Sequence, residues 1–172
     1  MNEKRRLLGM TLDELKGVAF EAGLPGYAAK QMADWLYKKK VTSIAAMTNI
    51  ASAKRALLEK NFEVGAVPPS DLMKSVDGTI KYLYPAGPGN FVESVYIPTE
   101  DRATLCVSSQ VGCKMNCLFC MTGKQGFTKN LSANEILNQI QSLPETEELT
   151  NIVFMGMGEP LDNVDELFKV LE

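Results

Sequence analysis

The sequence contains no histidine and only four cysteines in 172 residues. Zinc sites that mix cysteine and histidine ligands are therefore excluded. No apolar stretch approaches the roughly 20 residues of a membrane-spanning helix, and the start MNEKRRLLGM lacks the apolar core of a signal peptide. We therefore expect a cytoplasmic protein without a membrane segment. In that reducing compartment, clustered cysteines are more often metal ligands or catalytic thiols than disulfides.

Charges of the two signs are unevenly distributed along the chain. Residues 1–60 carry eleven Lys and Arg against six Asp and Glu, whereas residues 61–172 carry seven against fifteen. A basic N-terminal third suggests a polyanionic partner such as a nucleic acid. The three consecutive lysines at 38–40 are equally consistent with the solvated end of a helix.

The first part of the chain has helical patterns and the second part alternates strands with helices. A capping box at residues 11–14 opens one helix, and further apolar stripes predict helices over 28–36 and 51–60. Strands are predicted at 79–84, 91–98 and 103–107, followed by a capped helix from residue 132, a buried parallel strand at 151–155 and a last helix from residue 163. This order predicts an α/β fold that ends in two consecutive βα units.

Three of the four cysteines, Cys113, Cys117 and Cys120, lie within eight residues in the spacing C-x3-C-x2-C. Structural zinc normally takes four ligands, and the one other thiol, Cys106, falls within a predicted strand. A four-iron cluster held by three cysteines keeps one iron open for a substrate or cofactor. The spacing therefore favours an open-site [4Fe-4S] cluster over zinc and over unligated thiols.

This spacing resembles the signature of the radical S-adenosylmethionine (SAM) enzymes, in which the open iron binds the methionine part of the cofactor. Phe119 matches the aromatic residue that precedes their last cysteine, although core packing explains it equally well. The stretch GMGEP at 156–160 resembles the superfamily's "GGE" motif. The resemblance assigns Cys113, Cys117 and Cys120 to the cluster, and Gly158 with Glu159 to S-adenosyl-L-methionine.

The flanking sequences TLCVSSQVGCKMNCLFCMTGKQGFTKNLSANEI and FMGMGEPLDN look like the RlmN group of dual-specificity methyltransferases, which methylate C2 of adenosine in 23S rRNA and tRNA. The resemblance implies an RNA-engaging helical domain at 1–64, a β linker region at 65–100, and the first two βα units of a partial (βα)6 radical SAM barrel at 101–172. It also implies a monomer that receives electrons from a donor such as flavodoxin.

Two further residues take roles from this resemblance alone. Glu93 matches the family's proton acceptor, and Cys106 matches a cysteine that helps release the product by thiol chemistry; otherwise each is an ordinary strand residue. The family's methyl-carrying cysteine has no counterpart here, because no cysteine follows Cys120. We therefore expect that the chain as written is the front part of a longer protein and does not complete a methylation cycle.

Three alternatives stay open. Residues 1–60 could serve as an RNA-binding module without catalysis, because they are basic and helical. A related radical SAM methylase acting at C8 of adenosine would share the cysteine pattern. A small zinc protein would differ in colour, since zinc sites are colourless and iron–sulfur sites are brown.

Overall fold

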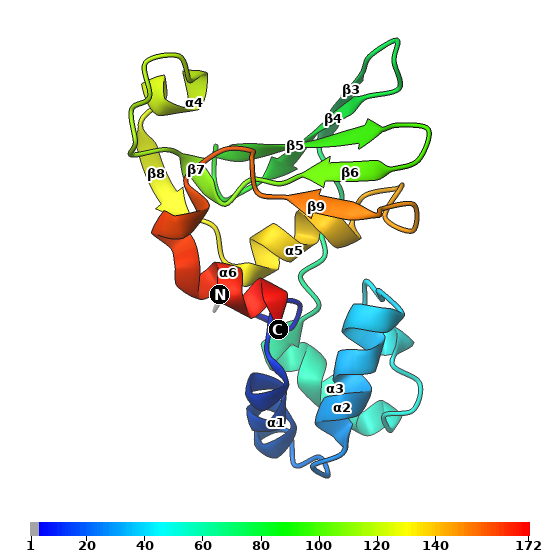
Figure 1. The fold of residues 1–172 in the computed structure, drawn as a ribbon. Helices are drawn as coiled ribbons and strands as arrows, with labels where there is room; N and C mark the ends of the chain where they lie inside the picture. The colour runs from blue at the N-terminus through cyan, green and yellow to red at the C-terminus, as the bar shows by residue number, and fades with distance from the viewer. Residues whose placement is uncertain (1–3) are drawn as a thin grey trace. The chain divides into compact units, whose positions relative to one another are not determined.

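The computed structural model describes residues 4–172 and shows two compact units, one of residues up to Ala66 and one of Val67–Leu171 (Figure 1). Residues 1–3, which belong to the predicted domain at 1–64, lie outside the described residues. Among the described residues, no helix has the length and apolar character needed to cross a membrane.

The N-terminal unit contains the three predicted helices. Its elements are α1 (Leu12–Glu21), α2 (Ala28–Ala33) continued by the π-helical turn η1 (Asp34–Lys38), the short η2 (Ile44–Ala46), and α3 (Ser52–Asn61). Two short strands that the sequence did not predict, β1 (Arg5–Arg6) and β2 (Phe62–Glu63), pair in parallel. This pairing joins the start of the unit to its end.

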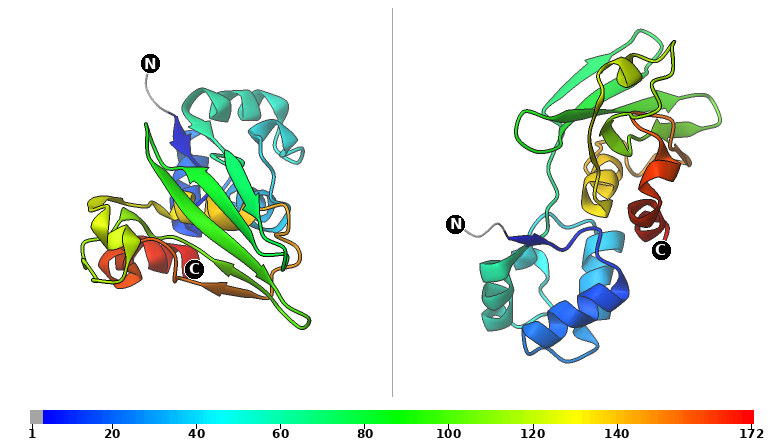
Figure 2. Two further views of the ribbon diagram at one scale, coloured as in Figure 1. Left: turned by 90° about the horizontal axis from the view of Figure 1, so that it is seen from above. Right: turned by 90° about the vertical axis from the view of Figure 1, so that its left-hand side faces the viewer.

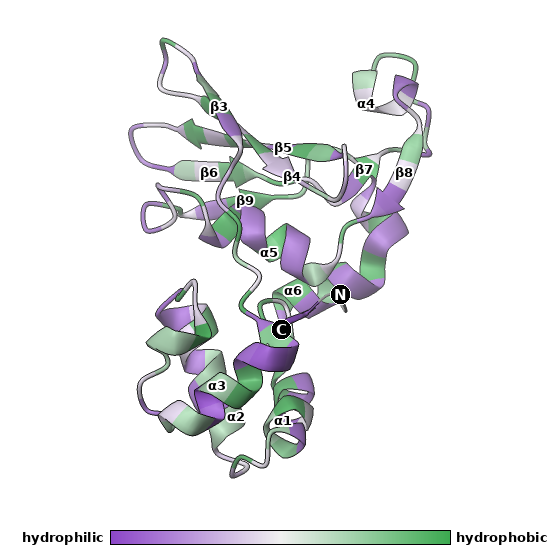
Figure 3. Ribbon diagram, turned by 180° about the vertical axis from the view of Figure 1, so that it is seen from behind, coloured by the Kyte–Doolittle hydropathy of each residue, from purple (hydrophilic) through white to green (hydrophobic). Residues whose placement is uncertain are grey.

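The capping box that predicted α1 is present in the structure. The Thr11 hydroxyl accepts a hydrogen bond from the Glu14 N–H, and the Glu14 carboxylate accepts one from the Thr11 N–H. Apolar and polar residues are both present along each helix (Figure 3), and the buried positions of the helices are apolar. The largest fully buried side chains of this unit are Leu7, Leu8, Leu15, Met32, Leu36, Met47 and Leu58.

The second unit is built on a five-stranded sheet in the order β3-β4-β5-β6-β9. Its strands are β3 (Asp71–Lys74), β4 (Ile80–Pro85), β5 (Phe91–Pro98), β6 (Ala103–Cys106) and β9 (Asn151–Val153). Neighbouring strands are antiparallel except β6 and β9, which are parallel as predicted. The strands before residue 100, expected in a linker region, thus share one sheet with the strands expected to start the barrel.

Helices α5 (Ala133–Gln141) and α6 (Val164–Leu171) lie on one face of this sheet (Figures 1 and 2). Side chains along β4, β5 and β6 alternate between buried and half-buried, so one face of each strand packs against the helices. Tyr82, Tyr84, Leu105 and Ile136 form the centre of this core.

The prediction that 151–155 is a buried strand is wrong in one respect. The strand runs parallel to β6, but it spans only Asn151–Val153 and its Ile152 is 43% exposed; Met155, at 81% exposed, lies beyond its end. The reason is position: among the described residues, β9 pairs only with β6 and forms an edge of the sheet. An apolar run predicts a buried strand only where the faces of the sheet at that strand are covered.

A second sheet, also not predicted, carries the three clustered cysteines. β7 (Gln110–Gly112) and β8 (Phe127–Asn130) pair in antiparallel fashion, and the residues between them include the short helix α4 (Met121–Lys124). The chain then passes through α5 to β9, and the 3-10 turn η3 (Pro160–Asn163) leads into α6. The cysteines therefore lie in a hairpin connection rather than directly after β6.

Leu105→Ala tests whether the covered face of the sheet stabilises the second unit. Leu105 has no exposed surface, so its truncation should lower the free energy of unfolding by about 2–5 kcal/mol. The control Leu118→Ala changes a side chain that is 91% exposed and should alter it by less than about 0.5 kcal/mol. Urea denaturation followed by circular dichroism measures both; equal effects would contradict this account of the core.

Candidate functional site

The cysteine loop, residues 113–120, is closed at its base by two glycines. The Cys113 N–H donates to the Gly126 carbonyl oxygen over 3.1 Å. Gly112 has φ +75°, and a Cβ at this position would lie 1.7 Å from the same carbonyl oxygen. Only glycine combines this backbone conformation with this close approach. The sequence thus fixes where the loop leaves β7 and where it returns.

Within the loop, backbone N–H groups are arranged around the last cysteine. The Cys120 N–H donates to the Cys117 carbonyl oxygen over 3.0 Å, which forms a tight turn. The pKa of the Cys120 thiol is lowered, first by a hydrogen bond from the Gly123 N–H and then by hydrogen bonds from Thr122. A lowered pKa favours the thiolate, which is the form that binds metals.

The three clustered cysteines are the thiols in this part of the chain that could hold an iron–sulfur cluster. All three are free, and Cys117 is exposed. Among residues 4–172, no group of three His, Cys, Asp or Glu side chains is arranged to hold one metal ion. In a four-iron cluster, each of three cysteines would bind a different iron and leave the fourth iron open. Next to them, Leu118 and Phe119 are more than nine-tenths exposed and could cover such a group.

The GMGEP loop, residues 156–160, follows β9 and runs against the segment that leads from β6 to β7. The Gly156 N–H donates to the Val107 carbonyl oxygen over 3.1 Å, and the Met157 carbonyl accepts from the N–H groups of Ser109 and Gln110 at 2.9 and 3.2 Å. The Ser108 hydroxyl accepts from the Met157 N–H over 2.8 Å. Backbone groups therefore fasten the loop to residues 107–110.

Both glycines of this loop are required by space. A Cβ on Gly156 would lie 2.7 Å from the Val107 carbonyl oxygen. Gly158 has φ +94°, and a Cβ there would lie 2.5 Å from the Gln110 Cβ. The next residue, Glu159, accepts a hydrogen bond from the Leu161 N–H through Oε1 over 3.2 Å and so caps η3. Gly158 and Glu159 therefore occupy fixed backbone positions.

An ion pair links the cysteine loop to the segment after the GMGEP loop. The Lys114 ammonium lies 3.0 Å from Asp162 Oδ2, and 4.4 Å from the centre of the Phe127 ring. The hydrogen bond from Lys114 lowers the pKa of Asp162. Since Asp162 lies in η3, the two loops that the sequence singled out are joined by a side-chain contact.

Glu93 and Cys106 share the other face of the large sheet, opposite to α5 and α6. Cys106 pairs with Val95 across β5 and β6, and Glu93 lies two residues from Val95 on the same face. Burial raises the pKa of Cys106, although the Met155 N–H opposes this effect through a hydrogen bond. Cys106 is therefore a neutral thiol near neutral pH.

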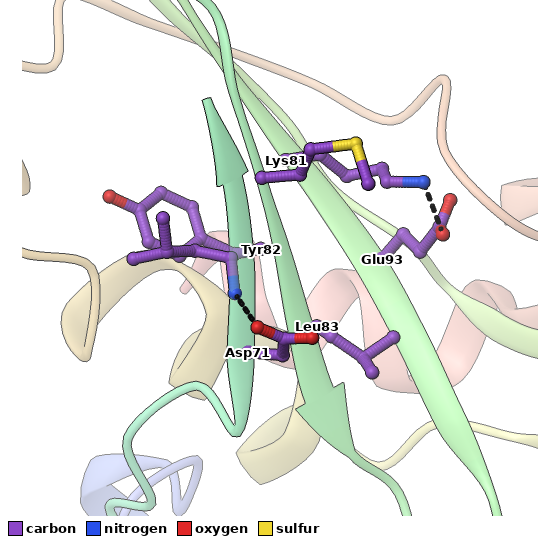
Figure 4. A pocket seen from close by; sticks show the side chains of 7 residues that line it. Asp71, Lys81, Tyr82, Leu83 and Glu93 are labelled. Atoms are coloured by element: carbon purple, nitrogen blue, oxygen red, sulfur yellow. Dashed lines mark hydrogen bonds and ion pairs between the residues drawn. The ribbon is translucent and has the colours of Figure 1, made fainter. Parts of the chain in front are cut away.

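The Glu93 carboxylate pairs with Lys81 of β4, whose Nζ lies 2.9 Å from Glu93 Oε1 (Figure 4). Both side chains are a little over two-fifths exposed. They border a shallow pocket of about 150 Å³, lined by Asp71, Leu72, Met73, Lys81, Tyr82, Leu83 and Glu93. A small part of a ligand could therefore reach this carboxylate from solvent.

Sequence reasoning singled out the cysteines, Gly158 and Glu159 but missed the side chains that hold them in place. Three side chains beside the motifs make these contacts. The Ser108 hydroxyl accepts from the Met157 N–H, Gln110 Oε1 accepts from the Glu159 N–H, and Lys114 pairs with Asp162. Ser and Gln have no strong preference for one kind of site, so their positions carried no separate signal. Complete burial is what distinguishes Ser108 and Gln110, and the sequence does not show it.

Comparison with protein families matches both ends of the chain. Residues 5–64 match the model of the "Ribosomal RNA large subunit methyltransferase N-terminal domain". Residues 107–172 match the model of the "Radical SAM superfamily". The second match includes the three clustered cysteines and the GMGEP loop.

Individual relatives extend over the whole chain. A probable dual-specificity RNA methyltransferase RlmN of Parabacteroides distasonis is 83% identical over 172 residues, and the chain covers 50% of it. The dual-specificity RNA methyltransferase RlmN of Geobacter sulfurreducens is 46% identical over 164 residues, 46% of its length. A crystal structure of a radical SAM methyltransferase from Sphaerobacter thermophilus matches 97% of the chain and 51% of its own, with a TM-score of 0.87 and 36% identity. The chain spans about half the length of these relatives.

Gly112→Ala should disrupt the base of the cysteine loop. The left-handed backbone conformation costs roughly 1–2 kcal/mol for alanine, and the overlap with Gly126 adds about 1–3 kcal/mol. Gly126→Ala is the matched control, because φ is +77° there but no atom lies within 4 Å of the added Cβ. Denaturation in urea should show a larger loss of stability for Gly112→Ala; equal losses would mean that the close approach contributes nothing.

Proposed function

Because the chain belongs to the RlmN group within the radical SAM superfamily, we propose that it forms the first half of an RNA methyltransferase that methylates C2 of adenosine in 23S rRNA and tRNA. One observation supports this most directly. Residues 107–113 connect the GMGEP loop at one end to the cysteine loop at the other, through hydrogen bonds of Val107, Gln110 and Cys113. A cluster and a cofactor that must touch each other need their binding loops on one rigid support.

The clustered cysteines and the GMGEP loop take the cofactor roles in this proposal. Cys113, Cys117 and Cys120 would hold a [4Fe-4S] cluster, and Gly158 and Glu159 would bind the methionine part of S-adenosyl-L-methionine. When bound, these groups supply the one-electron chemistry of the superfamily. Adenine C2 needs such chemistry because this carbon is electron-poor and is neither acidic nor nucleophilic.

Glu93 and Cys106 act on the substrate side. Glu93 would accept the proton that leaves C2, from its position beside the shallow pocket. Cys106 would help release the product together with a second cysteine, and it starts as a neutral thiol because burial raises its pKa. No cysteine after Cys120 in this sequence serves as that partner or as the methyl carrier.

The resemblance to the RlmN group also suggests the protein's oligomeric state, location and partners. The protein would work as a monomer in the cytoplasm, on 23S rRNA and tRNA, and would receive electrons from a donor such as flavodoxin. The N-terminal unit would engage the RNA. The match of residues 5–64 to a ribosomal RNA methyltransferase domain supports this role.

Anaerobic reconstitution with iron and sulfide tests the cluster assignment. We expect a brown protein with a four-iron electron paramagnetic resonance signal that changes when S-adenosylmethionine is added. Alanine at Cys113, Cys117 or Cys120 should abolish the signal, whereas Cys106→Ala should retain it, because Cys106 lies outside the cysteine loop. A colourless chain that retains zinc would contradict the radical SAM assignment for this chain.

A second candidate function is RNA binding by the N-terminal unit without catalysis. Residues 1–60 carry an excess of positive charge, and the Lys39 ammonium lies 3.5 Å from the centre of the Trp35 ring. Trp35 also donates a hydrogen bond to Asn49 Oδ1 over 2.6 Å, so its ring is held in place. The π-helical turn containing Trp35 is a rare form that is frequent at functional sites.

Replacing Lys38, Lys39 and Lys40 together by Gln tests this surface. The affinity for a tRNA transcript should fall at low salt, and the slope of log affinity against log salt should decrease by about 2–3 if all three contact phosphates. The control replaces Lys74, Lys124 and Lys169 of the second unit, with the same loss of charge. Equal effects of the two triple variants would show that net charge, rather than this surface, attracts RNA.

A further inference from the structure

Gln110 belongs to none of the motifs. It is fully buried, and both polar atoms of its side-chain amide make contacts. Its Oε1 accepts a hydrogen bond from the Glu159 N–H over 2.9 Å. Its Nε2 donates to Asn130 Oδ1 over 2.9 Å and lies 3.5 Å from Asp162 Oδ2. The side chain therefore connects the GMGEP loop to β8 and to η3.

Steric contact adds to these hydrogen bonds. A Cβ on Gly158 would lie 2.5 Å from the Gln110 Cβ and 2.7 Å from its Cγ. The backbone of Gly158 thus lies directly on the Gln110 side chain. A substitution that alters the shape of this side chain therefore moves Gly158 and Glu159, the two residues that bind the cofactor in the proposed function.

We propose that Gln110 is a positioning residue that fixes the backbone of Gly158 and Glu159 in the arrangement that binds the methionine part of S-adenosylmethionine. This role rests on the proposed function for the identity of the ligand, but the contacts that support it do not. Its physical basis is the cost of an unmade hydrogen bond: without the amide oxygen of the buried Gln110, the part-buried Glu159 N–H loses its partner and the loop opens more readily.

Two variants separate the parts of the contact. Gln110→Met keeps the length of the side chain but removes both polar atoms. Gln110→Glu keeps an oxygen that accepts from the Glu159 N–H but loses the donor to Asn130. The matched control is Asn138→Leu, because Asn138 is another buried amide, which accepts from the Val67 N–H and donates to the Val67 carbonyl oxygen at 2.7 and 2.8 Å. That contact stabilises the same unit without touching the GMGEP loop.

Amide hydrogen exchange, measured residue by residue on the whole chain, gives the first readout. In Gln110→Met, exchange at Glu159 should accelerate about 10- to 100-fold relative to the amides of β4 and β5. In Gln110→Glu the acceleration should be smaller than in Gln110→Met, because one oxygen still accepts from the Glu159 N–H although the new carboxylate lies near Asp162. Asn138→Leu should lower the melting temperature without a selective change at Glu159. The same acceleration at Glu159 in Asn138→Leu would overturn the proposal.

Two further measurements make every outcome decisive. If Gln110→Met does not fold, a scalar coupling across the hydrogen bond between the Glu159 nitrogen and the Gln110 side-chain carbonyl carbon can be sought in the unchanged chain; its absence would also overturn the proposal. On the reconstituted chain, Gln110→Met should weaken S-adenosylmethionine binding at least tenfold and Asn138→Leu should not. If the unchanged chain takes up no cluster, the proposed function fails, while the exchange data still decide whether Gln110 fixes the loop.

Discussion

The close approach of two backbone segments, residues 107–110 and residues 156–158, is the constraint on which the candidate site depends. Neither Gly156 nor Gly158 has room for a side chain of its own, since a Cβ on Gly156 would lie 2.7 Å from the Val107 carbonyl oxygen and one on Gly158 would lie 2.5 Å from the Gln110 Cβ. The approach extends the parallel pairing of β6 and β9 beyond the ends of both strands. It therefore carries the order of the sheet into the loop that follows β9, at the edge where parallel α/β sheets place their ligands.

The same principle operates at the cysteine loop, with different partners. There Gly112, at the end of β7, lies against the carbonyl oxygen of Gly126, and this contact closes the base of the loop that contains the three thiols. The segment 107–113 contacts the GMGEP loop at one end and leads into the cysteine loop at the other. The ion pair of Lys114 and Asp162 joins the two loops a second time. A surface ion pair of this kind is worth little energy by itself. Its value here is geometric, because it restrains a loop that is otherwise exposed.

The sequence predicted the elements whose signals are local. Both capping boxes are present, and the direction of β9 relative to β6 follows from the βα order. The burial of β9 could not be predicted, because it depends on which strands are its neighbours. The pairing of β7 with β8 could not be predicted either: β7 is three residues long, and a Gly112 bulge interrupts its register. Among the site residues, the spacing of the cysteines was visible, but the buried contacts of Ser108 and Gln110 arise only from tertiary packing.

The fold shifts the pKa values of Cys120 and Cys106 in opposite directions, because it places the two thiols in different surroundings. Cys120 stands at the start of α4, where N–H groups lower the pKa of its thiol and favour the ligand form. Cys106 stands at the end of β6 in the large sheet of the second unit, where burial raises the pKa and keeps the thiol protonated. A thiol that stays neutral binds metals poorly, because metals bind the thiolate. In the proposed function, Cys106 acts on the substrate, whereas Cys113, Cys117 and Cys120 hold the cluster.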